Sequence, residues 1–103
     1  MKIRLIATDM DGTLLDDEKN VSERSRRALM QAAEKGIQLV PATGRMLDMI
    51  PEEVLSIPSV RYVIVSNGSL VKDVRSGETI FRAEIPCDEA VQICRRLKTH
   101  DAM

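Results

Sequence analysis

Three short apolar segments, each followed by polar and small residues, most constrain the fold of this chain. They span residues 3–7, 37–40 and 61–65. A near-continuous apolar run of this length is typical of a strand buried on both faces of a parallel sheet. Helical segments separate the three runs. The order strand–helix–strand–helix–strand predicts an α/β fold with a three-layer parallel sheet and right-handed crossovers.

The two helices between these strands are predicted from residues that favour helix ends. Ser22 is suited to cap the N-terminus of the first helix, and Gly36 is suited to end it. The second helix, over residues 46–55, must accommodate Pro51 at its start or at a kink. Proline lacks a backbone N–H and clashes with the preceding turn of a helix.

The pattern changes after the third strand. Residues 70–74 and 79–82 flank a polar turn, which predicts a β-hairpin. A last helix is expected after Pro86, capped by Cys87 or Asp88.

The composition fits one small domain and excludes several classes of protein. The chain has 103 residues, of which 44% are hydrophobic and 30% charged, as is typical of a soluble globular protein. A net charge of −1 provides no field that would attract nucleic acid or a membrane surface. No apolar run reaches the ~20 residues of a membrane span, and the first run is too short for a signal peptide. We therefore expect neither a nucleic-acid nor a membrane partner.

The two cysteines, Cys87 and Cys94, both fall in the predicted last helix. At ~1.5 Å rise per residue their Cα atoms would lie about 10 Å apart, which is too far for a disulfide bond between them. We expect two free thiols, buried or half-buried, in the reducing environment of the cytoplasm.

Polar side chains follow each predicted strand at its carboxyl end. Asp9, Thr43 and Asn67 occupy these positions, and ligands of open α/β sheets bind in the crevice outside such ends. Asp9 and Asp11 can both face this crevice, because side chains two apart at a strand end point the same way. Two adjacent carboxylates repel each other unless a cation is present, and Mg²⁺ favours such oxygen ligands together with substrate phosphate. Gly12 would let the backbone approach a ligand closely.

The loop that begins at Asp9 also allows other interpretations. Taken alone, its Asp-x-Asp-Gly pattern fits a structural turn equally well, because Asp and Gly favour turns. A calcium-binding EF-hand is excluded, because Leu14 stands where the invariant glycine belongs. A P-loop and a dinucleotide-binding motif are excluded because the chain contains neither glycine-rich pattern.

Three segments together resemble the haloacid dehalogenase superfamily of hydrolases. Residues 9–14 (DMDGTL), after an apolar strand, resemble its first motif, and residues 42–45 (ATGR) resemble its second. Residues 65–69 (VSNGS), followed by a hairpin, resemble the Cof-type branch of capped sugar phosphatases, in which alanine usually stands in place of Ser69. The three segments occur in the family's order, and the resemblance covers nearly the whole chain.

The resemblance implies a role for each matched residue. Asp9 corresponds to the nucleophile that forms an aspartyl-phosphate, and Asp11 to the general acid/base. Mg²⁺ would be held by the Asp9 carboxylate and the Asp11 backbone carbonyl. The Thr43 hydroxyl, with Gly44 beside it and the backbone amides of Asp11 and Gly12, would bind the phosphate.

Two further residues, Arg45 and Asn67, allow two interpretations each. Arg45 would contact the substrate or the cap, or is simply a surface arginine at a helix start. Asn67 would contact the substrate, or makes a turn with Gly68.

The resemblance also implies the domain organisation and the function. It predicts a partial haloacid dehalogenase-like core with its hairpin over residues 1–85, followed by the start of a cap domain or a terminal helix over residues 86–103. The implied function is that of a cytoplasmic, Mg²⁺-dependent phosphatase of small phosphorylated metabolites, chiefly sugar phosphates. A phosphomutase of the same superfamily and a non-catalytic fragment that binds a partner are the alternatives.

Two further motifs of the superfamily have no counterpart in this sequence. One supplies a lysine that stabilises the phosphate, and the other is a Gly-Asp-x-x-x-Asp-like stretch that supplies additional metal ligands. We therefore expect the 103-residue chain to be incomplete and inactive by itself. An apolar surface left uncovered would favour self-association.

Overall fold

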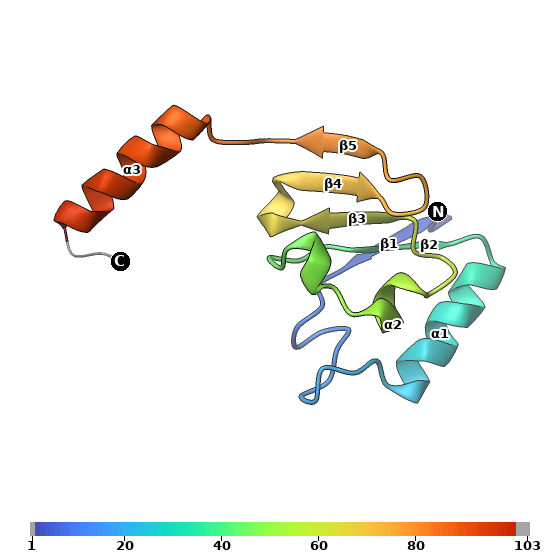
Figure 1. Ribbon diagram of the computed structural model, residues 1–103. Helices are drawn as coiled ribbons and strands as arrows, with labels where there is room; N and C mark the ends of the chain where they lie inside the picture. The colour runs from blue at the N-terminus through green and yellow to red at the C-terminus, as the bar shows by residue number, and fades with distance from the viewer. Residues whose placement is uncertain (1, 101–103) are drawn as a thin grey trace.

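The computed structural model describes residues 2–100, and strands and helices alternate along its first half as the sequence predicts (Figure 1). The three predicted parallel strands and the hairpin strands all form. Short 3₁₀ turns at Leu47–Met49 and Ser66–Gly68 lie between longer elements. In chain order these elements are β1 (Leu5–Thr8), α1 (Glu23–Glu34), β2 (Gln38–Pro41), α2 (Glu52–Leu55), β3 (Tyr62–Val65), β4 (Leu70–Asp73), β5 (Thr79–Arg82) and α3 (Cys87–Thr99).

The strands form a two-stranded sheet, β1–β2, and a three-stranded sheet, β3–β4–β5, which isolated bridges join in chain order. β1 and β2 are parallel, with Leu5 opposite Gln38 at one end of the pair. β2 continues to β3 through isolated parallel bridges, one of which joins Ala42 to Ile64. β3, β4 and β5 are antiparallel, with a register shift in β4. The α/β class with a parallel sheet is thus confirmed, and the hairpin extends the sheet on one side.

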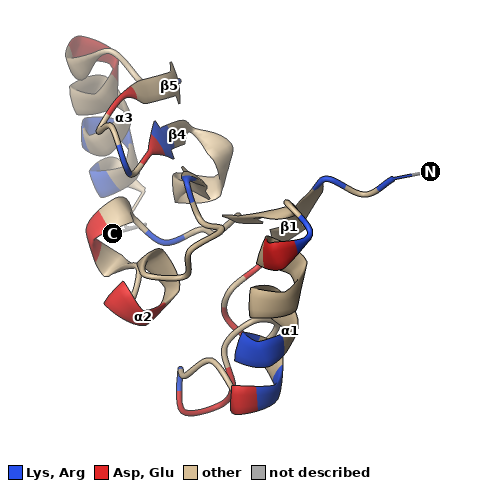
Figure 2. Cartoon of the chain, turned by 90° about the vertical axis from the view of Figure 1, so that its right-hand side faces the viewer, with Lys and Arg blue, Asp and Glu red and all other residues tan. Residues whose placement is uncertain are grey.

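Helix α1 begins and ends where its sequence indicates. The Ser22 side-chain oxygen accepts a hydrogen bond from the backbone N–H of Ser25 at 3.1 Å, which satisfies one of the free N–H groups at the helix start. Gly36 has φ +77° just beyond the helix end, a conformation that glycine adopts readily. Positive and negative side chains are mixed on α1 (Figure 2), and Arg26 of this helix pairs with Glu53 of α2 at 2.6 Å.

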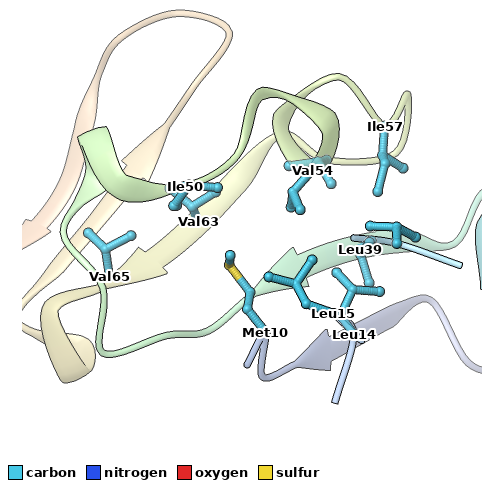
Figure 3. Close-up of a cluster of buried hydrophobic side chains, with 11 residues drawn as sticks. Met10, Leu14, Leu15, Leu39, Ile50, Val54, Ile57, Val63 and Val65 are labelled. Atoms are coloured by element: carbon cyan, nitrogen blue, oxygen red, sulfur yellow. The ribbon is translucent and has the colours of Figure 1, made fainter. Parts of the chain in front are cut away.

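The hydrophobic core lies between the sheet, α2 and the loop that follows β1 (Figure 3). This loop is fixed to the core by Met10, Leu14 and Leu15, which are all buried. Asp9 and Asp11 flank the fully buried Met10, so core packing also holds the loop that carries both carboxylates. The other buried members of the core are Val21, Leu39, Ile50, Val54, Ile57, Val60, Val63 and Val65.

The hairpin is anchored by a buried carboxylate. Asp73 is only 2% exposed, and its carboxylate accepts hydrogen bonds from Arg61 Nε at 3.0 Å and from the backbone N–H groups of Arg75 and Ser76 at 3.0 and 3.1 Å. Burial raises the pKa of Asp73, but the hydrogen bonds from Ser76, Arg61 and Arg75 outweigh it and lower that pKa to about 2.

Three sequence predictions require correction. The side chains of β1 are not buried on both faces, because only β2 pairs with this strand within residues 2–100; Leu5 and Ile6 are exposed. The predicted helix over residues 46–55 is divided into a 3₁₀ turn at Leu47–Met49 and helix α2, with Pro51 at the start of α2, one of the two positions that the sequence allowed for this proline. Helix α3 begins at Cys87 after Pro86, without a side-chain cap.

The prediction that the two cysteines are at least half-buried was also wrong. Cys87 and Cys94 are both exposed free thiols, because α3 projects away from the sheet after β5 and no described element covers its apolar side (Figure 1). Within residues 2–100, no helix is both long and apolar enough to cross a membrane.

Candidate active site

Four of the predicted site residues line one cleft at the carboxyl ends of the parallel strands. The cleft has a volume of about 400 Å³, and its lining includes Asp9 after β1, Thr43 and Gly44 after β2, and Asn67 after β3. Three strand ends that are distant in sequence therefore converge on one site. Asp11, Gly12 and Arg45 are not part of this lining and lie in the adjoining loops.

The Asp9 carboxylate is exposed and has one oxygen available. Its Oδ1 accepts a hydrogen bond from the backbone N–H of Met10 at 2.8 Å, and no hydrogen bond within residues 2–100 reaches Oδ2. The Asp9 carbonyl accepts from the backbone N–H of Leu14 at 3.3 Å, which closes the loop behind the carboxylate. The arrangement fixes one carboxylate oxygen and leaves the other free to bind a cation or to attack an electrophile.

The turn after Asp11 depends on glycine. Gly12 has φ +75°, a left-handed conformation that a residue with a Cβ adopts only at a cost. Around this turn the backbone N–H groups of Thr13 and Leu15 both donate to the Met10 carbonyl. Gly12 thus shapes the loop, whereas the hydrogen bond of Thr13 among the described residues is a local backbone contact.

Thr43 is held so that its hydroxyl proton remains available. The residue is 6% exposed, and its backbone N–H donates to the Ile64 carbonyl of β3 at 2.9 Å. Its Oγ1 accepts a hydrogen bond from the backbone N–H of Arg45 at 3.0 Å. Because Oγ1 acts as the acceptor in that contact, its O–H can donate to an anion in the cleft.

The loops after β2 and β3 are joined across the cleft. Backbone hydrogen bonds run from Ser66 N–H to the Arg45 carbonyl at 2.9 Å and from Asn67 N–H to the Thr43 carbonyl at 3.1 Å. Asn67 has φ +56°, and its Oδ1 lies 2.8 Å from the position that a Cβ on Gly44 would occupy. A side chain at position 44 would therefore require the end of the Asn67 side chain to shift.

Asp11 is bound by Arg45 in a two-pronged ion pair. Arg45 Nε and Nη2 donate to the two Asp11 carboxylate oxygens at 2.9 and 2.6 Å, and Arg45 Nη1 donates to the Met49 carbonyl at 2.9 Å. Hydrogen bonds from Arg45 and then from Lys19 lower the pKa of Asp11 from 3.8 to about 2. The same contact raises the pKa of Arg45. Neither interpretation of Arg45 from the sequence anticipated this partner.

Lys19 lies next to the site, and the sequence did not indicate that it contacts Asp11. Its Nζ lies 3.2 Å from Asp11 Oδ1, although it belongs to the polar segment after the first motif. A lone lysine in a polar loop has no distinguishing pattern, so only the fold could show that it reaches a carboxylate eight residues earlier.

The family is decided by a comparison with known sequence families. The model of the haloacid dehalogenase-like hydrolases matches residues 6–103, which is nearly the whole chain. The chain belongs to this family.

Relatives of known name within the haloacid dehalogenase-like family include phosphatases. A 5-amino-6-(5-phospho-D-ribitylamino)uracil phosphatase of Bacillus subtilis is 44% identical over 71 residues, which are 69% of this chain and 28% of that protein. An HMP-PP phosphatase of Shigella flexneri is 38% identical over 84% of this chain and 32% of its own length. The chain spans about a third of the length of the curated relatives that it matches.

Solved structures confirm the haloacid dehalogenase fold. The phosphatase BT1666 of Bacteroides thetaiotaomicron is similar with a TM-score of 0.84 at 32% identity, over 96% of this chain and 36% of that one. The sugar phosphatase BT4131 is similar with a TM-score of 0.80 at 25% identity, over 94% of this chain and 38% of that one. The fold predicted from the three motifs is therefore the one observed.

The haloacid dehalogenase-like site contains oxygen atoms that could hold a cation. The Asp9 carboxylate, through the oxygen that does not attack phosphorus, and the Asp11 backbone carbonyl are hard oxygen donors of the kind that Mg²⁺ prefers, and the Asp11 carbonyl accepts no hydrogen bond within residues 2–100. In the same range, no three His, Cys, Asp or Glu side chains gather into a metal centre. The loop therefore fits a cation that keeps several waters and shares the substrate's phosphate, as Mg²⁺ commonly does.

Proposed function

We propose that this chain supplies the nucleophile and part of the phosphate-binding site of a Mg²⁺-dependent phosphatase. The observation that carries the proposal is the free Asp9 carboxylate oxygen in the same cleft as the Thr43 hydroxyl. A carboxylate nucleophile and a hydroxyl donor at one strand-end cleft are suited to displacement at phosphorus, in which most of the catalysis is positioning and charge stabilisation.

In the first step, Asp9 Oδ2 forms a bond to phosphorus while the phosphorus–oxygen bond to the leaving group breaks. Asp11 donates a proton to the departing oxygen. In the second step, Asp11 takes a proton from water, the water oxygen bonds to phosphorus, and the bond to Asp9 breaks, which releases inorganic phosphate and restores the carboxylate. Thr43 donates a hydrogen bond to a phosphate oxygen throughout. Bound Mg²⁺ would neutralise charge between the nucleophile and the phosphate.

In the resting site, the ionised Asp11 is suited to accept a proton, which is its role in the second step. With its pKa lowered to about 2, the carboxyl is ionised at neutral pH and suited to accept a proton. Donation of a proton requires a higher pKa. A substrate phosphate brought close to Asp11 would raise that pKa, because a neighbouring negative charge favours the protonated carboxyl.

The proposed substrates are small phosphorylated metabolites, with sugar phosphates first among them. Support comes from the phosphatases among the relatives, whose substrates are small phosphorylated compounds, and from the sugar phosphatase among the similar structures. We further propose residues 1–85 as core and residues 86–103 as the beginning of a cap domain or a terminal helix, supported by the separation of α3 from the sheet. A cytoplasmic location is supported by the two free thiols.

The test is a phosphatase assay of the full-length gene product on a panel of sugar phosphates and a generic aryl phosphate. Turnover is expected with Mg²⁺ and should be lost with EDTA or with Asp9→Asn. Mass spectrometry of rapidly quenched protein should detect a phosphoryl group on Asp9. Asp17→Asn, which changes an exposed acid of the neighbouring loop, is the matched control and should keep full activity. Undiminished turnover by Asp9→Asn would exclude the mechanism.

A further inference from the structure

Lys19 has an unusual backbone conformation for its residue type. Its φ is +66°, in the left-handed region where a Cβ is crowded and where glycine or asparagine is the common occupant. Lys19 lies outside the cleft and outside the three segments that resemble the family motifs. A bulky residue that is maintained in this region is a reason to look for a function of its side chain.

The turn that carries Lys19 is mounted rigidly on the core. Asp16 Oδ1 accepts hydrogen bonds from the backbone N–H groups of Glu18 and Asn20, both at 2.9 Å. The Asp16 carbonyl also accepts from the Lys19 N–H at 2.9 Å. Immediately outside the turn, the buried residues Leu15 and Val21 form a bridge to each other. The backbone at Lys19 is therefore fixed on both sides, and the side chain is directed from a fixed point.

The ammonium group of Lys19 completes an arrangement of two cations around one carboxylate. Asp11 Oδ1 contacts Arg45 Nη2 at 2.6 Å and Lys19 Nζ at 3.2 Å. The two cations come from different parts of the chain, Arg45 from the loop after β2 and Lys19 from the 16–20 turn. The Asp11 side chain is 42% exposed, so without these contacts it would be free to exchange between rotamers.

We propose that Lys19 is a positioning residue that, together with Arg45, fixes the rotamer of Asp11 and directs its carboxylate for proton transfer. The role in proton transfer rests on the proposed function, whereas the fixed rotamer of Asp11 does not. Arg45 fixes Asp11 relative to the loop after β2. Lys19 fixes Asp11 relative to the loop that carries both residues. The Asp11 carboxylate therefore keeps its position when the Arg45 side chain moves.

The structural part is tested by NMR on the 103-residue chain. Three-bond couplings from Asp11 Cγ to the backbone N and carbonyl C report the rotamer. The wild-type chain should give the values of a single rotamer, Lys19→Met should give averaged values, and Lys19→Arg should restore the wild-type values. Lys35→Met removes an exposed lysine elsewhere and should change nothing.

Lys19→Gly separates positioning from stability. Glycine suits a φ of +66° better than lysine does, so the thermal midpoint should not fall, while the Asp11 couplings should become averaged as in Lys19→Met. Single-rotamer couplings in Lys19→Met or Lys19→Gly would overturn the proposal, because Arg45 alone would then hold the carboxylate.

The functional part is tested in the full-length gene product. Lys19→Met should lower kcat by about 10-fold, a fraction of the ~10²–10⁴-fold that a positioned acid/base provides, with KM changed less than about 2-fold and with recovery in Lys19→Arg. An unchanged kcat would overturn the proposal. If the wild-type protein hydrolyses no phosphate ester, the proposed function fails, and the couplings still decide whether Lys19 positions Asp11.

Discussion

Single residues of this chain combine an electrostatic and a structural role, and Asp73 shows this in its pH dependence. Its pKa in the folded chain is about 2, below the usual 3.8. The carboxylate therefore contributes stability above about pH 4, and this contribution is lost as the pH falls toward the folded value. We expect the free energy of unfolding in urea to decrease from about pH 5 to about pH 2, and less steeply in Asp73→Asn.

Asp73→Asn should also be less stable than the wild-type chain at neutral pH, because the ion pair with Arg61 is lost. Asp17→Asn is the control, since Asp17 is exposed. Part of the slope should persist in Asp73→Asn, because the pKa of Asp11 is lowered in the same direction. If the free energy of unfolding of Asp73→Asn falls with pH as steeply as that of the wild-type chain, titration of Asp73 does not contribute to the pH dependence.

The close contact between Gly44 and the Asn67 side chain gives a second prediction about single residues. A Cβ at position 44 would lie 2.8 Å from Asn67 Oδ1, so Gly44→Ala must shift the end of the Asn67 side chain. We expect Gly44→Ala to cost about 1 kcal/mol, the low end of the cost of overpacking, since the obstructing atom ends a side chain. In an Asn67→Gly background the clash is absent and glycine suits φ +56°. Gly44→Ala should then cost nothing measurable in a urea double-mutant cycle; equal costs in both backgrounds would contradict the contact.

At the scale of elements, the helix caps are the clearest local determinants. Ser22 caps α1 through the hydrogen bond from Ser25 N–H. Ser22→Ala should lower the free energy of unfolding by about 1 kcal/mol, because it leaves an N–H at the helix start without its partner. Gln31→Ala on an exposed position of the same helix is the matched control and should change stability by a few tenths of a kcal/mol. A loss no larger than the control's would mean that water replaces the cap.

Elements whose signals are local were predictable from sequence, and those that depend on packing were not. The cap at Ser22, the stop at Gly36 and the strand-end position of Asp9 each follow from one or a few residues. The division of the second helix at Pro51 was foreseen only as one of two options, because proline permits either a helix start or a kink.

The exposure of β1 and α3 could not be predicted, since an apolar pattern shows which face should be covered and not whether anything covers it. The contact between Arg45 and Asp11 joins residues 34 positions apart, and the salt bridge from Lys19 depends on a left-handed backbone. Neither has a sequence signal of its own. Sequence therefore identified the cleft, and the arrangement of cations around Asp11 emerged only from the fold.

At the scale of the molecule, the chain is more extended than its length requires. Its radius of gyration is 16.9 Å and its extents are 53 × 30 × 27 Å, whereas about 13 Å is typical of a compact domain of 100 residues. Helix α3 causes the difference, because it stands apart from the sheet (Figure 1). Its charges are divided, with Asp88 and Glu89 in the first turn and Arg96 and Lys98 in the last.

Exposed apolar side chains at both ends of the molecule predict that the 103-residue chain associates with a second copy of itself. Val91, Ile93 and Leu97 of α3 are 44%, 48% and 40% exposed, and Leu5 of the edge strand β1 is 52% exposed. Apolar side chains left exposed along a helix can form a surface that another chain covers. In an antiparallel pair of α3 helices the acidic start of each would face the basic end of the other, which favours this surface over β1.

Light scattering should therefore show a mass that rises with concentration toward a dimer. Ile93→Glu with Leu97→Glu should abolish that rise, whereas Leu5→Lys should leave it intact. A constant monomer mass, or loss of the rise only in Leu5→Lys, would show that α3 does not pair with itself.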